Sequence, residues 1–222
     1  QFISAGGTGI EDSGNGGTQV VYAFGKGTIV RLSAGLQNIT GGTGQITTML
    51  GGTQLIHGDG YGTIAVMSDG VQEIIGHSGL IEEMDSGTQI ISSGGTGTIG
   101  VQHDGIQEVR GKAVSTRVLG GTQILEAGGT LSKNVLLNGT QIIASGASLT
   151  ADSAGAELTV QANVISNATQ LIQSGGEATG FSLVNATQTV QGTANATTIN
   201  QGGVQNLDGG DTAATTINEG GV

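Results

Sequence analysis

The sequence predicts an all-β protein: a parallel β-helix, or solenoid, of about twelve coils with roughly 17–18 residues each. Three observations predict this fold. A Gln recurs at a nearly constant spacing, an aliphatic residue follows each Gln by two positions, and glycine pairs separate the repeats. Short β-branched segments joined by Gly corners at a fixed period are typical of a chain in which each strand stacks on its equivalent in the next coil.

The repeated unit is Gly-x-Gln-x-aliphatic. Its Gln recurs as Gln19, Gln37, Gln54, Gln72, Gln89, Gln107, Gln123, Gln141, Gln170, Gln188 and Gln205. The residue two places after each of these is aliphatic without exception, from Val21 to Leu207. Because side chains alternate along a strand, the Gln and its aliphatic partner share one face. We expect both to point inward, with the Gln amides bonded to one another along the axis.

A second strand is expected about ten to twelve residues after each Gln, where another aliphatic position recurs. It is predicted at 28–30, 45–46, 63–64, 80–81, 98–99, 118–119, 135–136, 198–199 and 216–217. A right-handed winding is favoured. Eighteen residues per coil would also suit a left-handed hexapeptide helix, but the six-residue aliphatic period of that fold is absent.

The residues on either side of each Gln are expected to face solvent. Threonine precedes the Gln in seven units, as Thr18, Thr53, Thr88, Thr122, Thr140, Thr169 and Thr187. Up to Ile124, units of the form Thr-Gln-aliphatic alternate with units of the form aliphatic-Gln-polar. Two interpretations fit this pattern: surface aliphatics inherited from a duplicated pair of coils, or a stripe of apolar and hydroxyl groups on which another molecule docks.

The repeats predict a single rod over residues 1–222, expected to be a segment of a longer chain. The one interruption lies between Gln141 and Gln170, where the spacing rises to 29 residues. We expect residues 144–168 to form an irregular coil, a hairpin or a bend. No segment with the composition of a linker divides the chain into two domains.

Composition excludes several functions. The chain has 6 Lys and Arg against 17 Asp and Glu, a net charge of −11, so nucleic acid and anionic membrane surfaces are not expected partners. It has no Cys, and no apolar run is long enough for a membrane-spanning helix.

The sequence gives little support for catalysis. The densest acidic group is Glu82, Glu83 and Asp85, for which no base is expected one coil away. His57, His77 and His103 stand at different offsets from their nearest Gln, so no shared metal is expected. We therefore predict a protein that is not an enzyme and that uses no metal or other cofactor.

Two stretches, at 87–95 and 197–207, resemble the passenger repeats of the AIDA-type self-associating autotransporter adhesins of Gram-negative bacteria. Similar units cover nearly the whole chain. The resemblance implies export through the periplasm and display on the bacterial surface. It implies lateral contacts between β-helices that hold a cell to copies on neighbouring cells, or to host surface receptors. It also implies sugar (heptose) transfer to surface Ser and Thr by a dedicated protein O-heptosyltransferase.

The seven threonines that precede a Gln are the candidate residues for self-association, and their hydroxyls are the candidate glycan acceptors. The alternative is that these threonines are only β-branched strand formers.

A passive stalk that presents a distal binding domain is the main rival function. An ice-binding β-helix needs a regular Thr-x-Thr array, and on the Gln strands only 187–189 fits. A carbohydrate-active β-helix ranks lower still.

Overall fold

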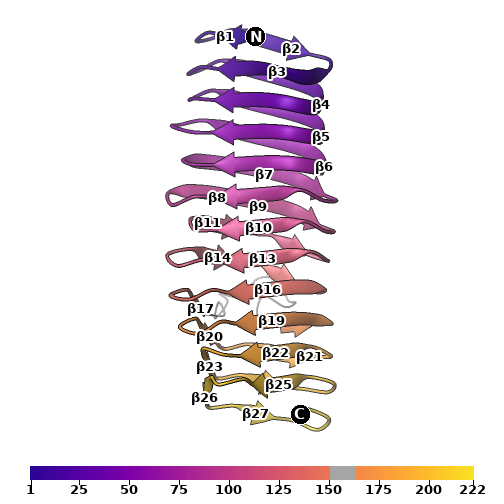
Figure 1. The fold of residues 1–222 in the computed structure, drawn as a ribbon, viewed down its shortest axis with the longest axis vertical. Coiled ribbons are helices and arrows are strands. Elements are labelled where there is room, and N and C mark those ends of the chain that lie inside the picture. The colour runs from indigo at the N-terminus through magenta and orange to yellow at the C-terminus, as the bar shows by residue number, and fades with distance from the viewer. Residues whose placement is uncertain (151–163) are drawn as a thin grey trace.

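The structure is a computed structural model that describes residues 1–150 and 164–222. Within these residues the chain is a parallel β-solenoid of about 11 turns without a helix, which confirms the predicted fold class. The coils stack from the N-terminus to the C-terminus along the long axis (Figure 1). On the near side of Figure 1 the strands run from right to left as the chain descends, so the winding is right-handed. Because no helix is found, the described residues offer no helical span for a membrane.

Each coil has three sides. The first side carries the repeated Gln and is called the Gln side; the second and third sides follow it along the chain. Strands confined to the Gln side are β1 Phe2–Ile3, β8 Thr88–Ile91, β10 Ile106–Val109, β13 Thr122–Leu125, β16 Gly139–Ile143, β19 Ala168–Ile172, β22 Thr187–Val190 and β25 Val204–Leu207. Each pairs in parallel with the equivalent segment in the next coil, as Gln107 does with Gln123. Strand β3 Gly14–Val21 begins on the third side, where Gly14 pairs with Leu32, and continues along the Gln side.

The second and third sides are continuous in the early coils and separate in the later ones. Strands that run through the second, third and Gln sides are β4 Lys26–Ile39, β5 Thr43–Ile56 and β6 Tyr61–Ile74, and those that join the second side to the third are β7 His77–Met84 and β9 Gly95–Gln102. Strands of the second side alone are β2 Thr8–Glu11, β11 Lys112–Val114, β14 Thr130–Ser132, β17 Ser148–Thr150, β20 Glu177–Thr179, β23 Thr193–Asn195 and β26 Asp211–Ala213. Strands of the third side alone are β12 Arg117–Val118, β15 Val135–Leu136, β18 Val164–Ser166, β21 Ser182–Val184, β24 Thr198–Ile199 and β27 Thr216–Ile217.

The predicted second strand was wrong, because its members belong to two different sides. Ile99 lies on the second side, where it pairs with Ile81. Val118 lies on the third side, where it pairs with Leu136. Both are buried aliphatic residues at nearly the same distance from a Gln, so a fixed offset cannot separate them. The chain bends between the two positions, and a coil therefore has three strands and not two.

The Gln side chains point inward and bond to one another along the whole rod, as predicted. In eleven successive steps the Nε2 atom of one Gln donates to the Oε1 atom of the Gln one coil earlier, from Gln19 on Gln1 to Gln205 on Gln188. The donor–acceptor distances of these eleven bonds are 2.6–3.1 Å. We call this row the amide ladder. A buried amide without a partner costs about 1–3 kcal/mol, and the amide ladder removes that cost at every coil.

In the early coils the amide ladder lies between two apolar columns. One column is formed by the aliphatic partners of the Gln residues, such as Ile56 and Ile74. The other combines isoleucine of the second side with methionine of the third, as in Ile64 and Met67. Opposite the amide ladder, on the second side, stands the glycine column, which contains Gly44, Gly62, Gly79 and Gly97. A Cβ on Gly79 would lie 2.7 Å from Ile74 Cδ1 and 2.9 Å from Gln72 Oε1, so this position has no room for a side chain.

The long spacing between Gln141 and Gln170 does not change the strand register on the Gln side. Gln141 pairs with Gln170 across this turn, and the Gln170 amide bonds to Gln141 at 2.7 Å. On the second side, Ser148–Thr150 pairs with Glu177–Thr179. The irregularity expected at 144–168 falls in part on residues 151–163, which lie outside the described residues.

Candidate contact surface

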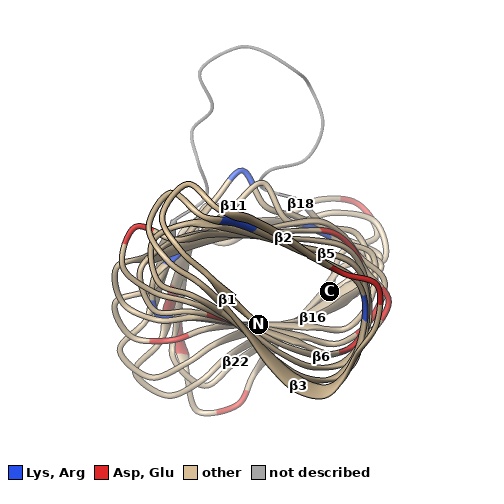
Figure 2. Cartoon of the chain, turned by 90° about the horizontal axis from the view of Figure 1, so that it is seen from above, with Lys and Arg blue, Asp and Glu red and all other residues tan. Residues whose placement is uncertain are grey.

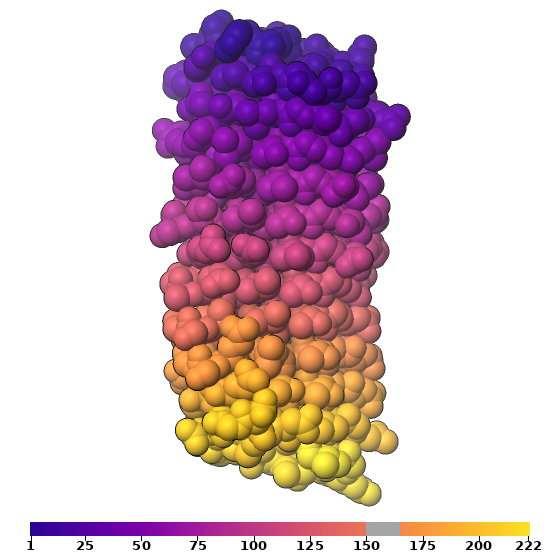
Figure 3. All heavy atoms as spheres, viewed as in Figure 1, coloured from indigo at the N-terminus to yellow at the C-terminus, as the bar shows by residue number. Residues whose placement is uncertain are grey.

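The amide ladder determines the outer surface of the Gln side. Because each Gln is buried, the residues immediately before and after it point outward. We call these outward residues the Gln face; Figure 3 shows this side of the rod as closely stacked rows of atoms, one row per coil. Strands in neighbouring coils lie about 4.8 Å apart, so residues at the same position form a column along the rod.

The seven threonines predicted as contact or acceptor residues lie in one column of the Gln face. The register pairs Thr122 with Thr140, Thr140 with Thr169, and Thr169 with Thr187. In the early coils an aliphatic residue separates each threonine from the next, as Val71 does between Thr53 and Thr88. Thr18 and Thr169 are exposed, and the other five are half-buried. The sequence therefore located this column correctly, while the role of its residues stays a prediction.

Apolar side chains occupy about half of the Gln face. They are Phe2, Val20, Leu36, Leu55, Val71, Ile90, Ile106, Ile124, Ile142, Leu171 and Val204. In the early coils they alternate between the two columns, as the sequence predicts. From β13 to β19 one column has aliphatic residues on three successive rungs, Ile124, Ile142 and Leu171, and it continues with Thr189 and Asn206. The result is a flat surface of mixed hydroxyl and aliphatic groups.

The charge on the Gln face is negative and sparse. Glu73 and Glu108 replace the aliphatic residue on alternate rungs of one column. Arg110 lies at the end of the same strand, with Nη2 3.6 Å from Glu108 Oε2. Seen along the axis, charged residues are scattered around the perimeter and do not gather into one patch (Figure 2).

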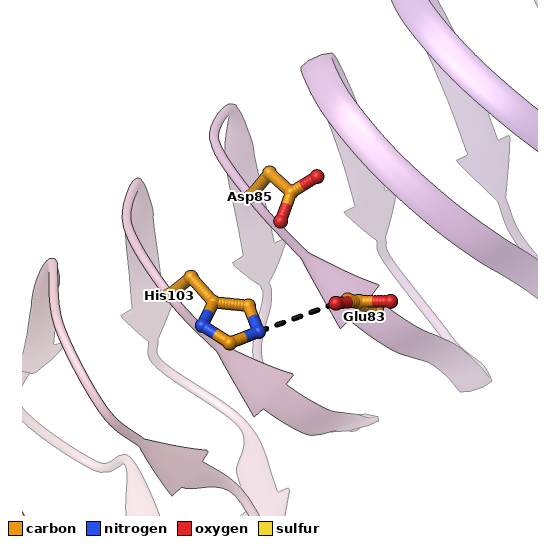
Figure 4. A group of neighbouring side chains, drawn as sticks. All are labelled: Glu83, Asp85 and His103. Atoms are coloured by element: carbon orange, nitrogen blue, oxygen red, sulfur yellow. Dashed lines mark ion pairs between the residues drawn. The ribbon is translucent and has the colours of Figure 1, made fainter.

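A group of two carboxylates and one imidazole lies away from the Gln face, on the third side. The Nε2 atom of His103 is 3.2 Å from Glu83 Oε1, and one ligand atom each of Glu83, Asp85 and His103 lie within 4.8 Å of one another (Figure 4). The expectation that no base stands one coil from these acids was wrong. Asp85 and His103 each precede a Gln by four residues, which was a signal in the sequence for their proximity. All three residues are exposed.

Sequence reasoning also missed a row of hydroxyl side chains on the second side. Strands here have outward, inward, outward triplets such as Thr96-Gly97-Thr98, whose central residue is buried. Within the described residues, twelve outward Ser and Thr form two columns, which we call the second-side hydroxyl columns. One column contains Thr8, Thr43, Ser78, Thr96, Thr130, Ser148 and Thr193, and the other contains Thr28, Thr63, Thr98, Ser132 and Thr179.

Comparison with known proteins identifies a solved structure of the same architecture. It is the crystal structure of a hyper-glycosylated fragment of TibA whose glycosylation is catalysed by TibC. The two structures superpose with a TM-score of 0.74 at 26% sequence identity, covering 99% of this chain and 89% of the TibA fragment. No protein-family model matches this chain, and no curated protein matches it in sequence.

Proposed function

We propose that this chain is the rod of a bacterial surface adhesin, exported through the periplasm and displayed outside the cell. It would hold cells together through lateral contacts with copies on neighbouring cells, or hold them to host surface receptors. The observation that supports this most is the Gln face, where a threonine or an aliphatic residue points outward beside each Gln from Gln19 to Gln205. The similarity to the TibA fragment over nearly the whole chain agrees with the resemblance of the repeats to the AIDA-type adhesins.

The physical basis of such adhesion is the sum of many weak contacts. Single exposed aliphatic side chains such as Ile106 add little each, but their repetition along a rigid rod acts as avidity. A second copy fits this requirement because an identical rod presents the same repeat at the same spacing of about 4.8 Å.

Glycosylation of surface Ser and Thr by a protein O-heptosyltransferase is the second part of the proposal. It is supported by the glycosylated state of the TibA fragment.

The test is the settling of cell suspensions whose cells display the chain. The double variant Thr53→Asp/Thr88→Asp adds two charges to the Gln face and should abolish clumping. The matched control is Thr63→Asp/Thr98→Asp, which changes two half-buried outward threonines on the second side at the same separation of 35 residues. The host should lack a protein O-glycosyltransferase, so that only the bare rod is compared.

Clumping that is lost in the first variant and kept in the control supports adhesion through the Gln face. Clumping that persists in a folded Thr53→Asp/Thr88→Asp variant contradicts it. If cells displaying the unaltered chain do not clump and do not bind host surfaces, the rod is a passive stalk and the adhesive function is wrong.

A further inference from the structure

We propose that the second-side hydroxyl columns, and not the threonines of the Gln face, are the acceptor surface for O-linked sugars. This inference rests on the proposed function in one respect: it assumes that the chain meets a protein O-glycosyltransferase during export. Thr28, Thr63 and Thr98 are the main acceptors. They belong to one column, and each is separated from the next by one other rung, occupied by Gln45 or Leu80.

The first reason is the chemical character of the two surfaces. Within the described residues, the Gln face has eight outward threonines among eleven large apolar side chains. The second side has twelve outward hydroxyls and only four large apolar side chains, which are Ile10, Tyr61, Leu80 and Val114. A sugar on Thr88 would cover Ile90 and Ile106, and so remove apolar area from the contact surface. A sugar on Thr63 leaves the Gln face free.

The second reason is that these hydroxyls are not used by the fold. In the described part of the chain, Ser78 is the one member of the two columns with a side-chain hydrogen bond to protein, to Nδ1 of His77 at 3.2 Å. Most of the others point outward from strands whose central residue is buried, as Thr96 and Thr98 do around Gly97. Their Oγ atoms can therefore accept a substituent without loss of an internal hydrogen bond.

The third reason is spacing. Rungs are about 4.8 Å apart, close to the width of a sugar ring, so sugars on adjacent rungs of one column would crowd each other. Thr28, Thr63 and Thr98 occupy every second rung, which leaves about 9.6 Å between their hydroxyls. Each can then hold one sugar. Ser78 and Thr96, which are adjacent in the other column, should not both be fully modified.

The reaction is a glycosyl transfer from a nucleotide-activated sugar. The threonine Oγ1 forms a bond to the anomeric carbon, and the bond between that carbon and the diphosphate oxygen breaks. The nucleoside diphosphate leaves with the bonding electron pair, and the hydroxyl proton passes to a base of the transferase. The chain contributes only the acceptor oxygen and its regular presentation along a rigid strand.

The test is co-expression of the whole chain with TibC, followed by intact mass measurement and mapping of the modified residues by mass spectrometry. Three proteins are compared: the unaltered chain, Thr63→Val/Thr98→Val, and Thr53→Val/Thr88→Val. Valine keeps the β-branched shape, so all three should fold, and a circular dichroism spectrum checks this. We expect Thr63→Val/Thr98→Val to lose about two sugars per chain and Thr53→Val/Thr88→Val to lose none.

Sugars confined to the Gln face, or a loss of mass only in Thr53→Val/Thr88→Val, would overturn the inference. So would a chain that TibC leaves unmodified. None of these outcomes decides adhesion by the bare rod, because that test uses a host without the transferase. Failure of the acceptor surface and failure of the proposed function are therefore distinguishable.

Discussion

The side-chain amide of Gln89 donates from Nε2 to Oε1 of Gln72 at 2.7 Å, although the two residues are 17 positions apart in the chain. Gln72 in turn donates to Gln54 at 2.7 Å, so each amide is both donor and acceptor along the axis. Both side chains are fully buried. The same bond recurs between all neighbouring coils, and it holds the strands in the register that produces the Gln face.

The substitution Gln72→Leu should destabilise the rod. It keeps a similar volume but leaves Gln54 Oε1 without its donor and Gln89 Nε2 without its acceptor, both buried. We expect the free energy of unfolding to fall by about 2–4 kcal/mol. Denaturant unfolding followed by circular dichroism measures this. The matched control is Gln45→Leu, an exposed outward residue of β5 that should change stability by less than about 0.5 kcal/mol. Equal effects of the two changes would contradict the role of the amide ladder.

The second prediction concerns side chains introduced into the glycine column. A side chain at Gly79 would meet Ile74 Cδ1 at 2.7 Å and Gln72 Oε1 at 2.9 Å, so Gly79→Val should overpack the interior. We expect a loss of about 1–3 kcal/mol, measured as a lower denaturant midpoint. At Gly17 a Cβ would have no atom within 4 Å, so Gly17→Val is the control and should be nearly neutral. If Gly79→Val left the denaturant midpoint unchanged, the interior would have to be wider than the contact of 2.7 Å with Ile74 Cδ1 implies.

The third prediction concerns the stability of the corners between the second and third sides. Ser115 has a φ of 56°, a left-handed conformation that costs a residue with a Cβ about 1 kcal/mol. Ser115→Gly relieves that strain, whereas Ser148→Gly, in β17, only adds backbone freedom to a strand. The first variant should be more stable than the second by about 1 kcal/mol in thermal or chemical unfolding. Equal stability, or the reverse order, would contradict the left-handed corner.

Salt should strengthen self-association. Each chain has a net charge of −11, so two rods repel one another at low ionic strength, while the proposed contact through the Gln face would be formed by apolar and hydroxyl groups. Raising the salt from about 10 mM to about 150 mM shortens the screening length from roughly 30 Å to roughly 8 Å. The association constant should rise several-fold across this range, as measured by light scattering. A fall with added salt would indicate contacts dominated by ion pairs.

The fold and the amide ladder could be predicted from the sequence because stacking makes every coil repeat the same environment. A buried Gln must find another Gln at the same place one coil away, and this requirement leaves a fixed offset in the sequence. The same logic locates the threonine column, from Thr18 to Thr187, from the sequence alone.

The third side could not be predicted, because inward aliphatic residues on two sides produce nearly the same offset. Ile99 stands ten residues after Gln89 and Val118 eleven residues after Gln107, yet they lie on different sides of the coil. The pairing of Glu83 with His103 was missed for a related reason. Glu83 stands six residues before Gln89 and His103 four residues before Gln107, so the two do not occupy equivalent positions in their coils. They meet because both side chains point outward.

Sedimentation velocity over a concentration series tests the central claim most directly, with the bare chain produced in a host that lacks a protein O-glycosyltransferase. We predict concentration-dependent association of the unaltered chain and of Thr63→Asp/Thr98→Asp, and a monomer at all concentrations for Thr53→Asp/Thr88→Asp. A single monomeric species for the unaltered chain, or equal association of all three proteins, would contradict self-adhesion through the Gln face.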